Sequence, residues 1–147
     1  MRYMGREIDF RHPAGAPSFC APDSLTWRIF KNQVVLGIGG IAAVFLELAE
    51  PRVRHGVWDH SSFRDKPLAR MRRTGQAAMV TVYAPREDAE AVIAAIGRMH
   101  ERVKGVTPCG KPYHANDPEL LAWVQATASF GFLEAYCAFA AALTDTE

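Results

Sequence analysis

The sequence predicts an all-α protein: an irregular helical bundle of about five to six helices without a significant sheet. Apolar residues recur at three- and four-residue spacing over several long segments, which is the period of an amphipathic helix. Prolines and N-capping residues separate these segments, and no alternating strand pattern of useful length is present. The chain has 147 residues, of which 49% are hydrophobic and 22% charged, so it can bury a core of its own.

We expect an extended N-terminal arm over residues 1–22 and a single helical domain over residues 23–147. Four turn-favouring residues interrupt the arm: Pro13, Gly15, Pro17 and Pro22. Asp23 or Ser24 can then cap the first helix, which begins an apolar pattern that runs to Ala49. Three glycines within this pattern indicate either a break or a close contact between two helices: Gly37, Gly39 and Gly40.

Pro51 ends this apolar pattern, because proline disfavours helix in the residue before it. A polar bend is expected over residues 52–67. Two helices should follow, over residues 68–83 and 86–104, with Gly105 well placed as the C′ residue of the second.

A loop is expected over residues 107–116, before a long last helix. Asp117 is a favourable N-cap, and Pro118 suits the first helical position because its missing N–H is not needed there. The apolar pattern then continues to about Leu143, so this helix should be the longest in the chain.

Charge and cysteine content narrow the classes of function. The net charge is +1, so no overall field favours nucleic acid. Three widely spaced cysteines lack zinc-site or CxxC spacing, which indicates free thiols in a reducing compartment: Cys20, Cys109 and Cys137. The N-terminus has no apolar signal core, and the apolar run over residues 34–48 is shorter than the ~20 residues of a membrane span. We therefore expect a cytoplasmic protein without a transmembrane segment.

The most unusual feature of the sequence is a histidine on an apolar helix stripe. Five residues at helical spacing form the stripe: Ala89, Val92, Ile93, Ile96 and Val103. His100 falls on the same stripe, and because burial of an unpaired imidazole costs free energy, it needs a carbonyl, a side chain or a metal as partner. On the preceding helix, Arg70 and Thr74 line up with Ala77 and Ala78. This small face leaves room either for a flat ligand or for another helix.

These residues lie within a series of segments whose order and spacing resemble a known family. The segments are LELAEPRVRHGVWDHSSF (46–63), RMRRT (70–74), HERVKG (100–105), GKPYHANDPELLAWVQAT (110–127) and AYCAFAAAL (135–143). Together they resemble the catalytic-domain family of latex-clearing protein (rubber oxygenase) and the mycophenolic-acid-pathway oxygenase. The resemblance covers roughly residues 24–143.

The resemblance implies a mostly helical oxygenase that holds haem b and cleaves carbon–carbon double bonds of isoprenoid chains with dioxygen. It assigns the axial iron ligand to His100, in an H-x-x-V-x-G motif. It places Arg70 and Thr74, of an R-x-x-x-T motif, beside the haem, with Arg73 as the basic residue just before the threonine. Arg70, Arg73 and Thr74 are therefore the candidate catalytic residues, and a small hydrophobic substrate and dioxygen are the expected partners.

The chain departs from the family pattern in two ways. Glu47 and Glu50 stand where the family usually has Gln and His, and Gln125 stands where it often has His. Family domains also usually continue past the helix that is expected to end near Leu143. The chain thus looks like a C-terminally shortened member, whose partly uncovered last helix would favour a homo-oligomer.

Two other classes of function remain open. A non-haem metal-binding bundle would use the carboxylates and imidazoles of residues 47–60, but this segment has one Glu-x-x-Glu, and the chain has no Glu-x-x-His set. His55 and Asp59 have helical spacing, yet a helix is not expected beside Pro51 and Gly56. The chain can also be read as a non-catalytic helical interaction module that kept the family's packing without its chemistry.

Overall fold

The computed structural model describes residues 1–144, and in this part of the chain the predicted all-α fold is confirmed. Its six helices are α1 (Leu25–Phe30), α2 (Gln33–Glu47), α3 (Pro51–His60), α4 (Pro67–Tyr83), α5 (Arg86–His100) and α6 (Pro118–Phe139). Two antiparallel hairpins are small additions: β1 (Arg2–Tyr3) with β2 (Arg6–Glu7), and β3 (Lys104–Val106) with β4 (Pro112–His114).

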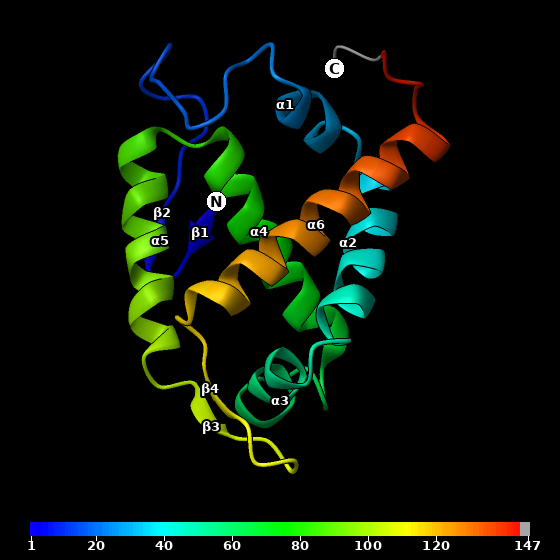
Figure 1. Ribbon diagram of the computed structural model, residues 1–147. Coiled ribbons are helices and arrows are strands. Elements are labelled where there is room, and N and C mark those ends of the chain that lie inside the picture. The colour runs from blue at the N-terminus through cyan, green and yellow to red at the C-terminus, as the bar shows by residue number, and fades with distance from the viewer. Residues whose placement is uncertain (145–147) are drawn as a thin grey trace.

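Figure 1 shows α6 crossing the bundle diagonally, with α2 against its C-terminal half and α5 at the opposite edge of the molecule. α4 runs behind α6 and turns into α5, which descends antiparallel to it. α3 lies across the lower end, beside the β3–β4 hairpin. The C-terminal ends of α2 and α5 and the N-terminal end of α4 therefore meet at the same end of the bundle.

The tightest helix contact joins α2 to α6 and explains two glycines. A Cβ at Gly39 would lie 2.9 Å from Cα of Phe132 and 3.0 Å from the carbonyl oxygen of Gly131. A Cβ at Gly131 would lie 2.8 Å from the carbonyl oxygen of Gly39. The Phe132 ring is closer still, with Cδ1 at 2.7 Å from a Cβ at Gly39, but movement of that ring would leave the backbone atoms in the way. α2 is unbroken across its glycines, so of the two interpretations the structure selects the close helix contact.

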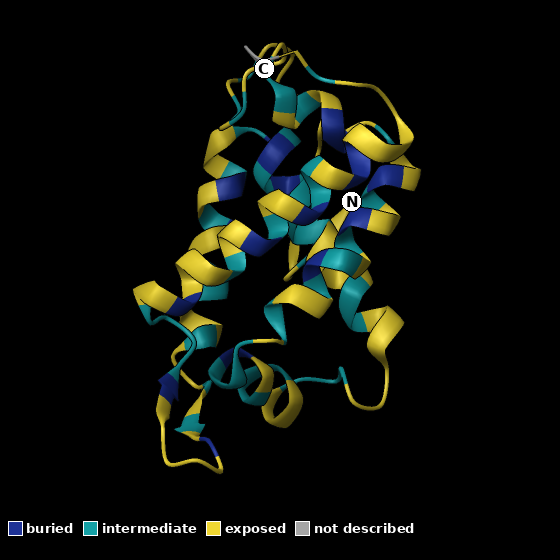
Figure 2. Ribbon diagram, turned by 45° about the vertical axis from the view of Figure 1, so that its right-hand side comes forward, coloured by how far each residue is buried: buried dark blue, intermediate teal, exposed yellow. Residues whose placement is uncertain are grey.

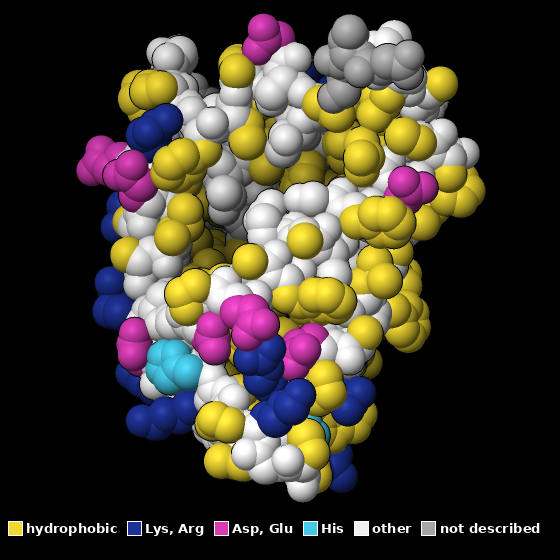
Figure 3. Space-filling view, viewed as in Figure 1, with side chains coloured by type: hydrophobic (Ala, Val, Ile, Leu, Met, Phe, Trp, Pro, Cys, Tyr) yellow, Lys and Arg dark blue, Asp and Glu magenta, His cyan; other side chains and the backbone are white. Residues whose placement is uncertain are grey.

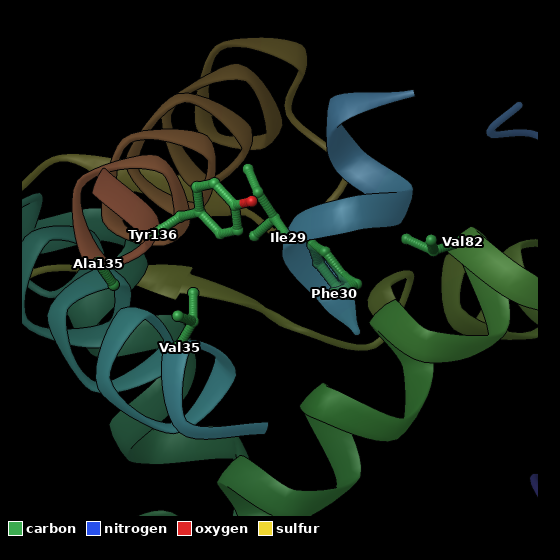
Figure 4. Packing of buried hydrophobic residues seen from close by; sticks show 6 residues of the cluster. All are labelled: Ile29, Phe30, Val35, Val82, Ala135 and Tyr136. Carbon is green, nitrogen blue, oxygen red and sulfur yellow. The ribbon is translucent and has the colours of Figure 1, made fainter. Parts of the chain in front are cut away.

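Buried apolar side chains form three groups. The first joins α1, α2, α4 and α6 (Figure 4): Ile29, Phe30, Val35, Val82, Ala135 and Tyr136. The second joins the N-terminal arm to α4 and α5: Ile8, Val80, Ala84, Ala89 and Val92. The third joins α3, β4 and α6: Val53, Tyr113 and Leu120. Figure 2 shows most buried segments in the upper part of the bundle, so the lower end is the more open one.

Residues 1–22 contain no helix, but they contribute to the core. Ile8 is fully buried between α4 and α5, and its backbone exchanges two hydrogen bonds of 2.7 Å with Met1. Arg6 forms an ion pair with Asp88 of α5 at 3.1 Å. The arm therefore packs against the helices and binds them at several points. The predicted domain boundary at residue 22 stays a prediction.

The prediction of a polar bend over residues 52–67 is wrong for its first half, because residues up to His60 belong to helix α3. Pro51 occupies the first turn, and the Glu50 side chain caps the helix by accepting the N–H of Arg52 at 3.1 Å. Proline is tolerated at this position because its N–H is not needed, so it marks the start of a helix as well as the end of the previous pattern. His55 Nδ1 and Asp59 Oδ2 then lie 3.2 Å apart on one helical face, contrary to expectation.

The second of the two expected central helices is shorter than predicted. α5 ends at His100 rather than Lys104, and Gly105 is not its C′ residue. Gly105 instead pairs with Tyr113 in the β3–β4 hairpin, where a Cβ would lie 2.6 Å from the tyrosine hydroxyl oxygen. Close approach of the ring therefore requires the glycine. This hairpin could not be predicted from the sequence, because strands of three residues are too short to show an alternating pattern.

The predicted start of the last helix is confirmed. Asp117 caps α6 by accepting the N–H of Glu119 at 2.9 Å, and Pro118 occupies its first turn. The helix ends at Phe139, slightly before the expected end near Leu143, but α6 is still the longest helix of residues 1–144.

Candidate functional site

The predicted site residues lie towards the lower ends of two helices, α4 and α5, which are joined at the top of the bundle (Figure 1). Arg70, Arg73 and Thr74 occupy the first two turns of α4, and His100 is the last residue of α5. α2 adds Glu47, which is its last residue. Arg70 interacts electrostatically with both His100 and Glu47. We call Glu47, Arg70 and His100 the polar cluster.

His100 is half-buried at the end of α5. Burial is the main cause that lowers the pKa of its imidazole below the ordinary 6.5, and the charges of Arg70 and His114 lower the pKa further. A hydrogen bond to the Asn116 side chain acts in the opposite direction. The lowered pKa favours the neutral form of the ring, and a neutral imidazole has a nitrogen lone pair available for a metal.

Only part of the apolar stripe that predicted this burial lies in the core. Ala89 and Val92 are fully buried against Val80 of α4, whereas Ile93 is 45% exposed. Val103 lies beyond the end of the helix. The imidazole of His100 therefore lies at the rim of the packed core rather than at its centre.

Arg70 and Thr74 lie one turn apart on α4 and bind each other. Nη1 of Arg70 donates to Oγ1 of Thr74, and that hydroxyl donates to the carbonyl oxygen of Arg70 at 3.2 Å. Burial lowers the pKa of the Arg70 guanidinium, and the Glu47 carboxyl opposes this shift. The guanidinium has thus lost part of its hydration without gaining a direct carboxylate partner among residues 1–144.

Arg73 points to a different surface. Its Nη2 donates to Oγ of Ser62 at 2.9 Å, and its side chain lines a shallow groove of about 700 Å³ beside α4. The residues of that groove are Ser62, Lys66, Leu68, Ala69, Arg72, Arg73 and Gln76. The structure thus gathers Arg70 and His100 and leaves Arg73 on a separate groove.

Glu47 is the member of the polar cluster that the sequence singled out only as a departure from the family pattern and as one possible ligand of a non-haem metal site. Burial raises the pKa of its carboxyl from 4.5 to about 7, and the positive charge of Arg70 only partly offsets this effect. The side chain keeps some accessible surface, so water reaches a carboxyl that the surrounding protein partly desolvates. The signal in the sequence was an acidic residue at the end of an otherwise uncharged helix.

Glu50, the second departure from the family pattern, lies outside the polar cluster. Its carboxylate accepts a hydrogen bond from Nε of Arg52 at 2.9 Å, and the same arginine binds Glu119 of α6 at 2.8 Å. The Arg52 side chain holds the pKa of Glu50 below its ordinary value. These residues and Trp123 line a pocket of about 280 Å³ between α3 and α6. Glu50 therefore joins two helices, whereas Glu47 faces Arg70.

The residues considered for a non-haem metal site are used in other contacts. His55 pairs with Asp59, and Nε2 of His60 lies 3.1 Å from the hydroxyl of Tyr113. Across residues 1–144, no group of three or more His, Cys, Asp or Glu side chains is placed to hold a metal ion. The imidazole and carboxylate groups of this segment stabilise α3 and the hairpin beside it.

The comparison with protein families gives one match. The model for the catalytic domain of the ER-bound oxygenase mpaB/B′ and rubber oxygenase matches residues 27–147, which include most of α1, all of α2 to α6 and the polar cluster. No curated protein and no solved structure matches the chain. This match covers most of the chain and agrees with the family resemblance of its sequence segments. The chain therefore belongs to the family of mpaB/B′ and rubber oxygenase catalytic domains.

Proposed function

We propose that this protein is a haem-b-dependent oxygenase that acts on a small hydrophobic, isoprenoid-like substrate with dioxygen. Family membership supports oxygenase chemistry. One observation carries the haem assignment: a half-buried imidazole, His100, whose neutral form is favoured, lies within electrostatic reach of the partly buried guanidinium of Arg70.

The donor groups of the polar cluster fit a haem on two counts. A neutral imidazole is a common axial ligand of haem iron. A guanidinium binds carboxylates such as haem propionates with two parallel hydrogen bonds. His100 would hold the iron and Arg70 a propionate, and the hydrogen bond with Thr74 restricts the Arg70 side chain. When bound, the haem supplies the oxygen chemistry, while the protein supplies the ligand, the charge and the apolar walls.

The surface beside the bundle core supports an apolar substrate. Figure 3 shows a hollow between α5 and α6 that is walled mainly by hydrophobic side chains. Ala77 and Ala78, about two turns beyond Arg70 on α4, are half-buried residues with small side chains. Glu47 adds a group that exchanges a proton near neutral pH, since its pKa is about 7.

The absorption spectrum of protein expressed with a haem precursor tests this function. The wild type is expected to show a Soret band that is lost or shifted in His100→Ala. His55→Ala is the matched control, because His55 is a partly exposed histidine paired with Asp59 on α3, and it should keep the band. Oxygen uptake with an isoprenoid oligomer, together with detection of carbonyl products, then tests the reaction.

A colourless protein whose spectrum added hemin leaves unchanged would overturn the haem assignment. The non-catalytic interaction module would then be the better interpretation of the family membership. An iron content without a Soret band would instead favour a non-haem metal protein.

A further inference from the structure

Asn116, in the loop between β4 and α6, is fastened to the end of α5. Its side-chain amide donates to the carbonyl oxygen of Gly97 at 3.1 Å and to Oε1 of Glu101 at 2.8 Å. Its backbone N–H donates to Nδ1 of His114 at 3.1 Å. Gly97 lies in the last turn of α5 and Glu101 is its C-cap residue. The loop therefore adds a second donor to the Gly97 carbonyl, which also accepts the backbone N–H of Glu101 at 3.2 Å.

These contacts determine which end of the amide faces the imidazole. A primary amide has two N–H donors and one carbonyl acceptor, and Gly97 and Glu101 take the donors. Oδ1 of Asn116 is left as the acceptor for the hydrogen bond that joins this side chain to His100. The Glu101 carboxylate is used elsewhere, because it accepts from Asn116 and lies 3.7 Å from Nε2 of His114.

We propose, on the basis of the haem function proposed above, that Asn116 is the positioning residue for the axial ligand. Its Oδ1 holds the ring N–H of His100, which fixes the tautomer and plane of the imidazole and leaves the other nitrogen free to bind iron. Ligating histidines usually have such an acceptor, and its removal typically weakens metal binding 10–100-fold. The amide is itself held by α5, so ligand and acceptor form one rigid unit.

Nitrogen-15 NMR of the histidine rings in the haem-free protein tests the contact without any cofactor. At pH 8 the wild-type His100 ring is expected to populate a single tautomer, with the signal assigned through His100→Gln. Asn116→Leu should give a mixture of both tautomers. The exposed ring of His12, which contacts Asp9 in the arm, is the internal control and should not change. A mixed His100 tautomer in the wild type would overturn the proposal even if Asn116→Leu failed to fold.

Haem titration separates this inference from the proposed function. Asn116→Leu is expected to raise the haem dissociation constant about 10–100-fold and to shift the reduction potential upward, whereas His100→Ala should abolish ligation. A wild type that binds haem, with Asn116→Leu unchanged in tautomer and affinity, would overturn the role of Asn116 alone. A wild type that binds no haem would overturn the function, while the NMR result would still decide the contact.

A second, independent observation concerns the exposed face of α2. No charged residue lies between Lys31 and Glu47, and the face opposite the α6 contact carries four exposed apolar residues at helical spacing. We call them the α2 stripe: Val34, Ile38, Ile41 and Phe45, which are between 37% and 73% exposed. Figure 3 shows hydrophobic side chains gathered along this side, over α2 and the adjoining part of α6.

Trp123 of α6 lies beside the end of the α2 stripe, since its Nε1 donates to the carbonyl oxygen of Glu47 at 3.3 Å. With this half-exposed indole, the stripe leaves on the order of 500 Å² of apolar surface in water, given side-chain areas of roughly 150–250 Å² for aromatic residues. The largest patch on a typical monomer is roughly 300–600 Å² and often functional. A polar rim around the stripe would bring the contact near the ~800 Å² per partner of a standard interface.

We infer that a second copy of this chain covers the α2 stripe, with the two α2 helices packed across a two-fold axis. A two-fold contact brings the same surface patch of each copy together, and an uncharged stripe meets itself without like-charge repulsion. Helices that lie on a membrane surface carry Lys or Arg on their polar face, and α2 has none. Within residues 1–144 no helix alone reaches the length and apolarity of a membrane span; α2 and α3 do so only together, bent by 110°.

Sedimentation equilibrium from 1 to 100 µM tests the dimer. The wild type is expected to be dimeric in the upper part of this range, and Ile41→Asp should weaken the dimer at least 100-fold. Ile93→Asp is the matched control, because Ile93 on α5 is 45% exposed and Ile41 is 50% exposed, and it should leave the dimer intact. A monomeric wild type at 100 µM would overturn the inference. So would a monomer that floats with phosphatidylcholine and phosphatidylserine vesicles, which would assign the stripe to a lipid surface.

Discussion

α2 meets two different environments along its length. In its middle, Gly39 lies in backbone contact with Gly131 of α6, and a Cβ at either glycine would meet backbone atoms of the other helix. At its end, Glu47 faces Arg70 in a cluster where burial disfavours the charge of each group. The first region stabilises the bundle. In the second region, burial disfavours the charged forms that Glu47 and Arg70 ordinarily have in water. Such an arrangement is typical of functional sites, where function opposes local stability.

The largest expected effect comes from filling the packed region. Gly131→Ala should destabilise the protein by about 3 kcal/mol, because the new methyl group meets the backbone of Gly39 and Ala43. For a chain of this size the melting temperature should fall by roughly 6–12 °C. Thermal unfolding followed by circular dichroism measures the change.

Gly37→Ala is the control for this prediction, because a Cβ at Gly37 on α2 has no neighbour within 4 Å. This substitution should be neutral or stabilising by up to about 1 kcal/mol, since alanine favours helix more than glycine does. Equal losses in the two variants would contradict the close-contact explanation.

A smaller effect of opposite sign is expected in the polar cluster. Glu47→Gln should stabilise the protein by about 2 kcal/mol at pH 8 and have little effect at pH 4.5. The folded wild type keeps the Glu47 proton up to a pKa of about 7, whereas the unfolded chain releases it near 4.5. Wild-type stability therefore falls as the pH rises from about 4.5 to about 7. The glutamine stays neutral and removes this slope.

Urea unfolding at several pH values between 4.5 and 8 measures the effect of Glu47→Gln. Glu50→Gln provides a control of opposite sign, because Arg52 lowers the pKa of Glu50. The folded protein binds the Glu50 proton less readily than the unfolded chain, so Glu50→Gln should lose stability at pH 8. A Glu47→Gln variant with the pH profile of the wild type would show that the carboxyl is solvated.

The smallest expected effect lies at the start of α6, next to the polar cluster. Asp117→Ala should cost about 1 kcal/mol, because it removes the acceptor for the N–H of Glu119. Because the α2–α6 contact holds α6 in place, loss of this N-cap hydrogen bond should not move Asn116, and the His100 tautomer should stay unchanged. Chemical denaturation and the histidine NMR spectrum of the same sample check the two expectations. A changed tautomer would show that the helix start and the cluster are coupled.

Local sequence patterns were sufficient to predict a structural feature when that feature depends on side chains that bind the backbone of the same segment. The aspartate and proline that begin α6 act on neighbouring N–H groups, so their meaning could be predicted from sequence. The same patterns failed for α3, because Pro51 fits both the end of one helix and the start of another. They also missed Asn116 and Glu47 as neighbours of the site, since no local pattern shows that the end of α2 and the loop before α6 lie close to Arg70 and His100.

The amino-acid sequence by itself determined the helical class of the protein, the capping of α6, and the presence of an imidazole and a guanidinium on successive helices. These properties follow from periodicity and from short-range hydrogen bonds, which depend on residues only a few positions apart. Only the tertiary structure decided that Glu47 joins Arg70 and His100, that Arg73 turns towards Ser62, and that Asn116 binds the end of α5. Those contacts join segments that are distant in sequence, and packing of the whole bundle determines which of their side chains meet.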